Sequence, residues 1–144
     1  MSTPFKVDSS PLPQYELQHM NGAKAIIRTY GGNCFSYITK EGIQVMGTRA
    51  DADIKFTDTK PYAGGNPHCF PQFGPGALMQ HGFARGMRFV PGERMKSDAS
   101  DRMTFQLVPT EDTRKVISRL PIIYLINGLL IYRSGIMTLN IDVM

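Results

Sequence analysis

The sequence predicts an all-β protein made of antiparallel strands. The chain has 14 glycines and 10 prolines among its 144 residues, which is typical of a turn-rich architecture. Short segments of alternating or β-branched residues recur between these turn signals. No segment has helical periodicity over a convincing length, although residues 110–119 could form a turn or two of helix. With 42% hydrophobic residues, the chain can bury the core of a single domain.

The N-terminal residues 1–20 are interpreted as a flexible leader. Pro4, Pro11 and Pro13 interrupt this polar stretch, which lacks the apolar segment of a signal peptide and the Arg-rich pattern of a transit peptide. The folded domain is therefore expected at 21–144, in a cytoplasmic protein.

The domain is expected to open with a β-meander. Residues 24–30 are rich in β-branched and aromatic side chains and end at a Gly-Gly pair. Residues 34–39 form the next expected strand. A tight turn at 40–42 then leads to a third strand at 43–46.

The later expected strands differ in clarity. Residues 103–108 alternate in polarity, and residues 137–143 alternate more cleanly still, as a half-buried strand does. The polar residues 91–101 are expected to form a loop. The last strand runs to the end of the sequence with nothing after it to cover its edge, so we expect the chain to stop in the middle of an architecture.

A dipeptide, Asn127-Gly128, separates two apolar runs at 122–126 and 129–132. This dipeptide favours a type I′ turn, so a two-residue hairpin is one interpretation. A longer strand followed by a loop is the other. The whole apolar segment 120–132 is too short to span a membrane as a helix, so no membrane partner is expected.

Net charge and cysteine content exclude few classes of binding partner. The formal net charge is +4, without a basic run, so an anionic small molecule fits as well as a nucleic acid. A basic β-domain that binds nucleic acid remains a hypothesis supported by charge alone. Cys34 and Cys69 have no CxxC spacing and are expected to be reduced thiols, with a disulfide between them as the alternative.

The segment at 64–88 is the most informative for function. It contains six glycines and three prolines, which predict a long loop, and such loops are usually functional. Phe70 and Phe73 could supply apolar platforms. The set of donors suits a polyhydroxylated or anionic ligand, because arginine forks onto carboxylates and phosphates. The polar residues of the segment are Asn66, His68, Gln72, Gln80, His81, Arg85 and Arg88.

Each of these residues also has a structural interpretation. A lone histidine such as His81 is more often a buried residue bonded to a backbone carbonyl. His68, beside a proline and Cys69, favours a packed turn. A metal site formed by His68, Cys69 and His81 would match no known zinc spacing and would lack a fourth ligand, so no metal is expected. Cys69 has no adjacent base and is a poor nucleophile, and Arg88 is equally plausible as a solvated strand residue.

Two motifs of the segment resemble a known family. They are GGNPHCFPQFGPG at 64–76 and MQHGFAR at 79–85. They look like the glucose-6-phosphate 1-epimerases, or hexose-6-phosphate mutarotases, of the galactose mutarotase-like (aldose 1-epimerase) superfamily. A weaker resemblance extends over residues 21–144. It implies a large antiparallel β-sandwich, of which this chain looks like a truncated N-terminal half.

The resemblance also implies a reaction, an isomerisation that interconverts the α and β anomers of a hexose 6-phosphate, with glucose 6-phosphate as the expected substrate. In the family a carboxylate acts as general base on the anomeric hydroxyl and a histidine acts as general acid on the ring oxygen. No metal or organic cofactor is needed, and a monomer is expected. By resemblance, Gln80 and Arg85 take substrate-binding places, and His81 lies in the same pocket and contacts the sugar.

The sequence departs from the family pattern at several positions. Ala63 stands where an arginine commonly precedes the Gly-Gly pair, and Gly86 stands where asparagine is usual. Arg88 and Phe89 occupy the region where an aromatic residue normally follows. The family's acid and base have no counterpart before Met144, so no catalytic residue is assigned and the 144-residue chain alone is expected to be inactive. A non-catalytic carbohydrate-binding module that recognises phosphosugars is the alternative.

Overall fold

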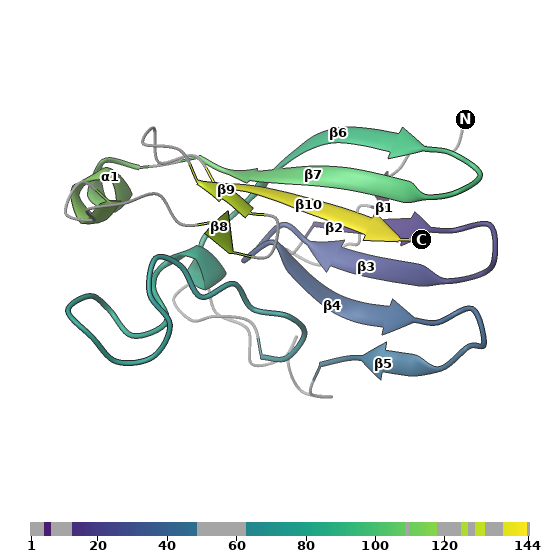
Figure 1. Cartoon of the computed structure of the whole chain (residues 1–144), viewed down its shortest axis with the longest axis horizontal. Helices are drawn as coiled ribbons and strands as arrows, with labels where there is room; N and C mark the ends of the chain where they lie inside the picture. Colours follow the sequence, from purple (N-terminus) through teal and green to yellow (C-terminus); the bar gives the residue numbers. More distant parts are fainter. Residues whose placement is uncertain are drawn as a thin grey trace.

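The computed structural model describes residues 5–6, 13–48, 63–108, 110–117, 125–126, 129–131 and 137–143. Within these residues the strands form two five-stranded sheets, in the orders β1-β2-β3-β4-β5 and β6-β7-β10-β9-β8 (Figure 1). All the strands within the two sheets pair antiparallel. The all-β antiparallel prediction is therefore confirmed.

The first sheet is the predicted meander with additional strands before it. The expected strands at 24–30, 34–39 and 43–46 are confirmed; the first and third are shorter than expected, and the second begins and ends one residue earlier. Glycines with positive φ mark the turns, for example Gly42 between the last two strands. The strands are β1 (Phe5–Lys6), β2 (Gln14–Gln18), β3 (Lys24–Arg28), β4 (Asn33–Ile38) and β5 (Gln44–Met46).

Strand β2 corrects the prediction of a flexible leader at 1–20. Tyr15 and Leu17 are buried while Glu16 and Gln18 are exposed, so the segment has the period-2 pattern of a half-buried strand. The preceding prolines do not prevent this, because they lie before the paired residues. The leader interpretation is wrong for these five residues.

The second sheet contains one strand that the sequence did not predict. Residues 91–101 were expected to form a loop, but most of them belong to β6. This strand lies at the edge of its sheet and is largely exposed, so its polar composition does not oppose strand formation. The strands are β6 (Val90–Lys96), β7 (Asp101–Leu107), β8 (Leu125–Ile126), β9 (Leu129–Ile131) and β10 (Met137–Val143).

The remaining strands of the second sheet were expected, but β10 is not an edge strand: it lies between β7 and β9, which corrects the expectation that it has no partner at its edge. Strands β8 and β9 pair with Ile126 opposite Leu129, which favours the hairpin interpretation; the dipeptide between them lies outside the described residues. Strand β10 pairs with β7 along its whole length, and with β9 at Met137 and Thr138.

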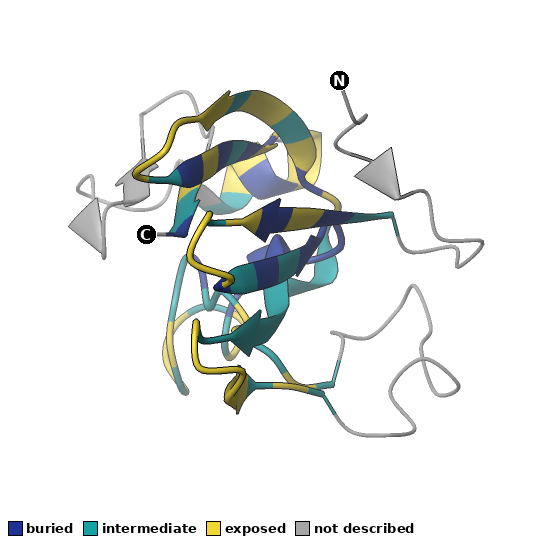
Figure 2. Ribbon diagram, turned by 90° about the vertical axis from the view of Figure 1, so that its right-hand side faces the viewer, coloured by how far each residue is buried: buried dark blue, intermediate teal, exposed yellow. Residues whose placement is uncertain are grey.

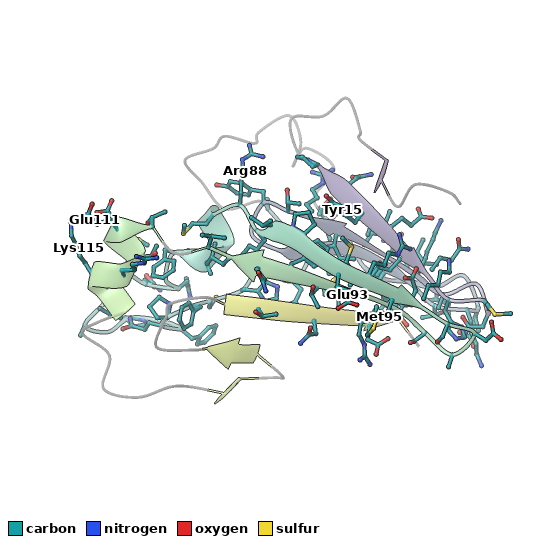
Figure 3. All side chains as sticks on the ribbon, turned by 90° about the horizontal axis from the view of Figure 1, so that it is seen from above. Tyr15, Arg88, Glu93, Met95, Glu111 and Lys115 are labelled. Atoms are coloured by element: carbon teal, nitrogen blue, oxygen red, sulfur yellow. The ribbon has the colours of Figure 1, made fainter. Side chains whose placement is uncertain are left out.

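A single short α-helix, α1 (Glu111–Ile117), is found in the described residues. Thr110 caps it, since the Thr110 hydroxyl accepts a hydrogen bond from the Thr113 amide at 3.3 Å. Lys115 forms an i,i+4 ion pair with Glu111 at 3.0 Å, visible on the outer side of the helix (Figure 3). No helix among the described residues is both long and apolar enough to cross a membrane.

The two sheets share one hydrophobic core, which makes the fold a β-sandwich (Figure 2). The Tyr15 ring of β2 meets the Phe105 ring of β7 edge-on, with ring centroids 5.6 Å apart. The other inward-facing core residues of these strands and of β3 and β10 are Leu17, Ala25, Ile27, Met103, Leu107 and Val143.

A buried carboxylate joins the same two sheets. Asp101 is completely buried and accepts hydrogen bonds from the Gln18 amide and from Arg94 Nε, each at 2.9 Å. Arg94 Nη2 also contacts this carboxylate and donates to the Glu16 carbonyl at 3.0 Å. Burial alone would raise the pKa of Asp101, but the bonds from Arg94 and Gln18 and the nearby Lys96 charge outweigh it and hold the pKa below its usual value.

Candidate functional site

The loop segment 63–89 lies at the end of the first sheet where β3 ends and β4 begins (Figure 1). The Asn66 amide donates to the Cys34 carbonyl at 3.0 Å, at the start of the segment. At its end, the Phe89 amide donates to the Thr29 carbonyl at 2.8 Å. The segment is loop as predicted, with one 3₁₀ turn, η1 (Ala84–Gly86). The first sheet thus provides a fixed base for both ends of the loop.

Asn33 anchors the first motif, and the sequence did not reveal its role. This buried side chain accepts a hydrogen bond from the Asn66 amide at 2.8 Å and donates to the Gly64 carbonyl at 3.0 Å. Gly65 has φ +69°, and a Cβ there would overlap the Asn33 side-chain oxygen. The Gly-Gly pair therefore serves close backbone packing. The one feature of the sequence that could have indicated this role is the position of Asn33, directly after the Gly-Gly turn at the start of β4.

His68 has a structural role. Its Nε2 lies 3.0 Å from the Gly32 carbonyl oxygen, and its ring lies 6.3 Å from that of Phe89. Burial lowers the pKa of His68, although the bond to Gly32 opposes this shift. The packed-turn interpretation is therefore supported. Phe70 is buried in the core, which corrects its assignment as a ligand platform.

A backbone closure isolates residues 71–81 as a loop of their own. The amides of Phe83 and Ala84 both donate to the Phe70 carbonyl, at 2.8 and 3.2 Å. Gly82 has φ +66°, and a Cβ there would overlap the same carbonyl oxygen. Only glycine allows the two ends to approach so closely.

Gln72 organises the interior of that loop. Its Nε2 donates to the carbonyls of Gly74 and Leu78, at 3.0 and 3.2 Å. Its Oε1 accepts a hydrogen bond from the Leu78 amide at 3.1 Å. A single side chain thus forms hydrogen bonds with three backbone groups of the loop.

His81 ends the loop in an unusual conformation. It is the non-glycine residue with positive φ, at +64°, in the described part of the chain. Its Nδ1 accepts a hydrogen bond from the Gly74 amide at 3.2 Å, and its ring centroid lies 5.4 Å from that of Phe73. A neutral ring that accepts at Nδ1 carries its proton on Nε2. The half-buried ring is therefore held by a backbone amide, and not by a backbone carbonyl as the structural alternative supposed.

Arg85 lies in η1, directly after the loop. Its carbonyl oxygen would lie 2.8 Å from a Cβ at Gly31, so its backbone packs closely against the turn after β3. Its side chain is half-buried, and its Nε is shielded from solvent without an acceptor among the described residues. No acidic residue occurs in the sequence between Asp58 and Glu93. The guanidinium charge is therefore not neutralised by this segment.

The three predicted site residues come from the end of one loop and its exit. Gln80 is exposed and adjacent to His81, and Arg85 follows four residues later. Within the described part of the chain no hydrogen bond joins these three side chains to one another, and His81 Nδ1 is occupied by the Gly74 amide.

Arg88 is an exposed residue shortly before β6. It pairs with Tyr30 in an antiparallel bridge, and its guanidinium carbon lies 5.9 Å from the Tyr30 ring centroid. Its side chain extends away from the body of the molecule (Figure 3). This arrangement fits the solvated-strand alternative.

The described residues contain no group of three or more His, Cys, Asp or Glu side chains that could hold a metal ion. Cys34 and Cys69 are free thiols, both partly buried, and burial raises the pKa of Cys34 even though the Ser36 backbone contact opposes this shift. A thiol in this state is a weak nucleophile.

Comparison with protein families gives a match over most of the chain. The family model of aldose 1-epimerase matches residues 13–116. The chain belongs to the aldose 1-epimerase family. Membership confirms the resemblance at this level and includes strand β2, which the leader interpretation had left out.

Solved structures support the same fold for this aldose 1-epimerase family member. It is similar to YeaD from Salmonella typhimurium, a candidate mutarotase, with 26% identity and a TM-score of 0.66, over 80% of this chain and 40% of that chain. The protein HI1317 is 23% identical with a TM-score of 0.61, over 76% of this chain and 43% of its own, and shows the fold alone. The chain thus spans about 40% of the length of these structures. No curated protein sequence matches it.

Proposed function

We propose that this chain supplies the phosphosugar-binding part of a hexose-6-phosphate mutarotase, with glucose 6-phosphate as the ligand. The observation that carries the proposal is the Arg85 guanidinium, which has no acceptor among the described residues and lies in a segment without carboxylates. Buried donors without partners are rare and call for an explanation. An anionic group of a ligand supplies the missing acceptor.

The neighbouring residues extend the recognition beyond the charge. Gln80 offers an amide that both donates and accepts, and His81 offers an Nε2–H donor whose tautomer is fixed by Gly74. Hydroxyl groups of a sugar need this mixture of donors and acceptors. Arg85 therefore binds the phosphate, and Gln80 and His81 orient the sugar ring.

The proposed reaction is ring opening and reclosure at the anomeric carbon. A general base removes the proton of the anomeric hydroxyl while a general acid protonates the ring oxygen, so the C1–O5 bond breaks and an aldehyde forms. Rotation about the C1–C2 bond and reclosure give the other anomer. None of the residues of this chain is assigned as that acid or base, so its contribution is to bind and orient the substrate.

Calorimetric titration of the chain with glucose 6-phosphate and with glucose tests the binding. We expect phosphate-dependent binding that Arg85→Ala weakens about 10- to 100-fold, as is typical for loss of charge-assisted hydrogen bonds. The matched control is Arg114→Ala, since Arg114 is an exposed arginine on α1, and it should leave the affinity unchanged. Equal affinities for the two sugars, or an unaffected Arg85→Ala variant, would refute the proposal.

Exchange NMR of the two anomers separates binding from catalysis. We expect the 144-residue chain to leave the exchange at its spontaneous rate, because the assigned residues bind but do not transfer protons. Binding without faster exchange would also be the behaviour of a non-catalytic phosphosugar-binding module. Exchange above the spontaneous rate would show that an acid and a base lie within this chain.

A further inference from the structure

The loop at 71–81 exposes an apolar ring to solvent, although the backbone of the loop is held in place by several hydrogen bonds. The side chain of Phe73 is 81% exposed, whereas Phe70 and Phe83 of the same motifs pack edge-on with centroids 5.7 Å apart. Single exposed apolar residues are common on protein surfaces. Phe73 differs because it lies against His81, whose backbone is itself in a sparsely populated conformation.

The contacts of His81 fix the position of its ring and leave Nε2 as the nitrogen that can bond to a ligand. Gln72 holds both sides of the turn that contains Gly74, and the Gly74 amide occupies His81 Nδ1. Positive φ at a non-glycine residue is energetically unfavourable, and such residues cluster at ligand-binding sites. The loop is therefore organised to hold an aromatic face beside one fixed N–H donor.

We infer that Phe73 determines specificity for the cyclic form of the sugar, a role that rests on the proposed function. The Phe73 face packs against the C–H face of a pyranose ring, and His81 Nε2–H donates to an oxygen at the edge of that ring. A pyranose combines an apolar face with hydroxyls around its rim, and an aromatic ring beside a donor is complementary to both. An open-chain sugar phosphate has no such face and gains nothing from Phe73.

The test compares glucose 6-phosphate with glucitol 6-phosphate, its acyclic analogue, by calorimetric titration. For Phe73→Ala we expect about tenfold weaker binding of glucose 6-phosphate, since roughly half of a phenyl surface is no longer buried by the ligand. The affinity for glucitol 6-phosphate should not change. Met95→Ala, which removes a half-exposed apolar side chain on β6, should change neither affinity (Figure 3).

Two results would overturn the inference: an unchanged affinity of Phe73→Ala for glucose 6-phosphate, or an equal loss for both ligands. The Arg85→Ala variant distinguishes failure of the Phe73 inference from failure of the proposed function. If Arg85→Ala weakens the binding of both sugar phosphates while Phe73→Ala weakens the binding of neither, only the role of Phe73 is refuted. If Arg85→Ala has no effect on either ligand, the proposed function itself is refuted.

Discussion

Arg94 and Arg85 show how differently the sandwich interior and the loop segment use the same side chain. Arg94 contacts a buried carboxylate and donates to the Glu16 carbonyl, and so joins the two sheets. Arg85 is also partly buried, but its Nε finds no acceptor among the described residues. The Arg94 guanidinium is therefore used inside the fold, whereas we propose that the Arg85 guanidinium is used to bind a ligand.

The loop segment is nevertheless as closely packed as the sandwich at the Phe70–Gly82 closure. Gly82→Ala should destabilise the protein by about 4 kcal/mol, because the added methyl group overlaps the Phe70 carbonyl and the backbone has positive φ. Gly42→Ala is the matched control, with positive φ and open space around it, and should cost about 1 kcal/mol. Urea unfolding of both variants measures the difference. Equal losses would mean that the closure is not tightly packed.

The sandwich interior should depend strongly on its buried ion pair. Asp101→Ala leaves Arg94 and the Gln18 amide without their acceptor and should cost about 3 kcal/mol. Glu111→Ala removes an exposed ion pair on α1 and should cost less than about 0.5 kcal/mol. Thermal or urea unfolding measures both. A loss below 1 kcal/mol for Asp101→Ala would show that this pair does not hold the sheets together.

The sequence predicted the parts of the fold that depend on local pattern. Strands β3 and β4 were evident from β-branched and aromatic residues, and β10 from its alternation. Strand β2 was missed because nearby prolines obscured the alternation of Tyr15 and Leu17. Strand β6 was missed because an exposed edge strand has the composition of a loop.

The candidate site was predictable as a loop but its construction was not. The sequence placed Gln80, His81 and Arg85 in one segment, and the structure confirms that this segment is loop. The anchor Asn33 bonds to a residue 33 positions away, and no local pattern reveals such a contact. The tautomer of His81 likewise depends on a backbone amide seven residues away.

His68 should make the stability of the protein depend on pH, with a smaller effect than the Gly82 and Asp101 substitutions. Burial lowers its pKa in the folded state, so the unfolded chain binds a proton first as the pH falls. Stability should be full above about pH 6.5, the ordinary pKa of histidine, and should decrease as the pH falls through the lower folded value. We expect His68→Gln, which keeps a donor for Gly32, to lose less stability between pH 7.5 and pH 5 in urea unfolding. An identical decrease in both proteins would assign the effect to other groups.

The smallest expected effect is that of Arg85 on stability. Because Arg85 has no hydrogen-bond partner among the described residues, Arg85→Ala should change the free energy of unfolding by less than about 0.5 kcal/mol. Arg94→Ala should be destabilising by several times that amount, since it removes the guanidinium donors from the buried Asp101 carboxylate and leaves only the Gln18 amide and the more distant Lys96 charge. Urea unfolding in the absence of ligand compares them. A loss of 2 kcal/mol or more for Arg85→Ala would place Arg85 among the structural arginines.

The central claim, that Arg85 is reserved for a phosphosugar, is tested most directly by NMR of the arginine Nε–H groups. Glucose 6-phosphate should shift the Arg85 signal and slow its exchange with water, whereas glucose should not. The Arg94 signal, already bonded to Asp101, should stay unchanged with either sugar. An Arg85 signal that does not respond to glucose 6-phosphate, while the chain binds it, would contradict the claim.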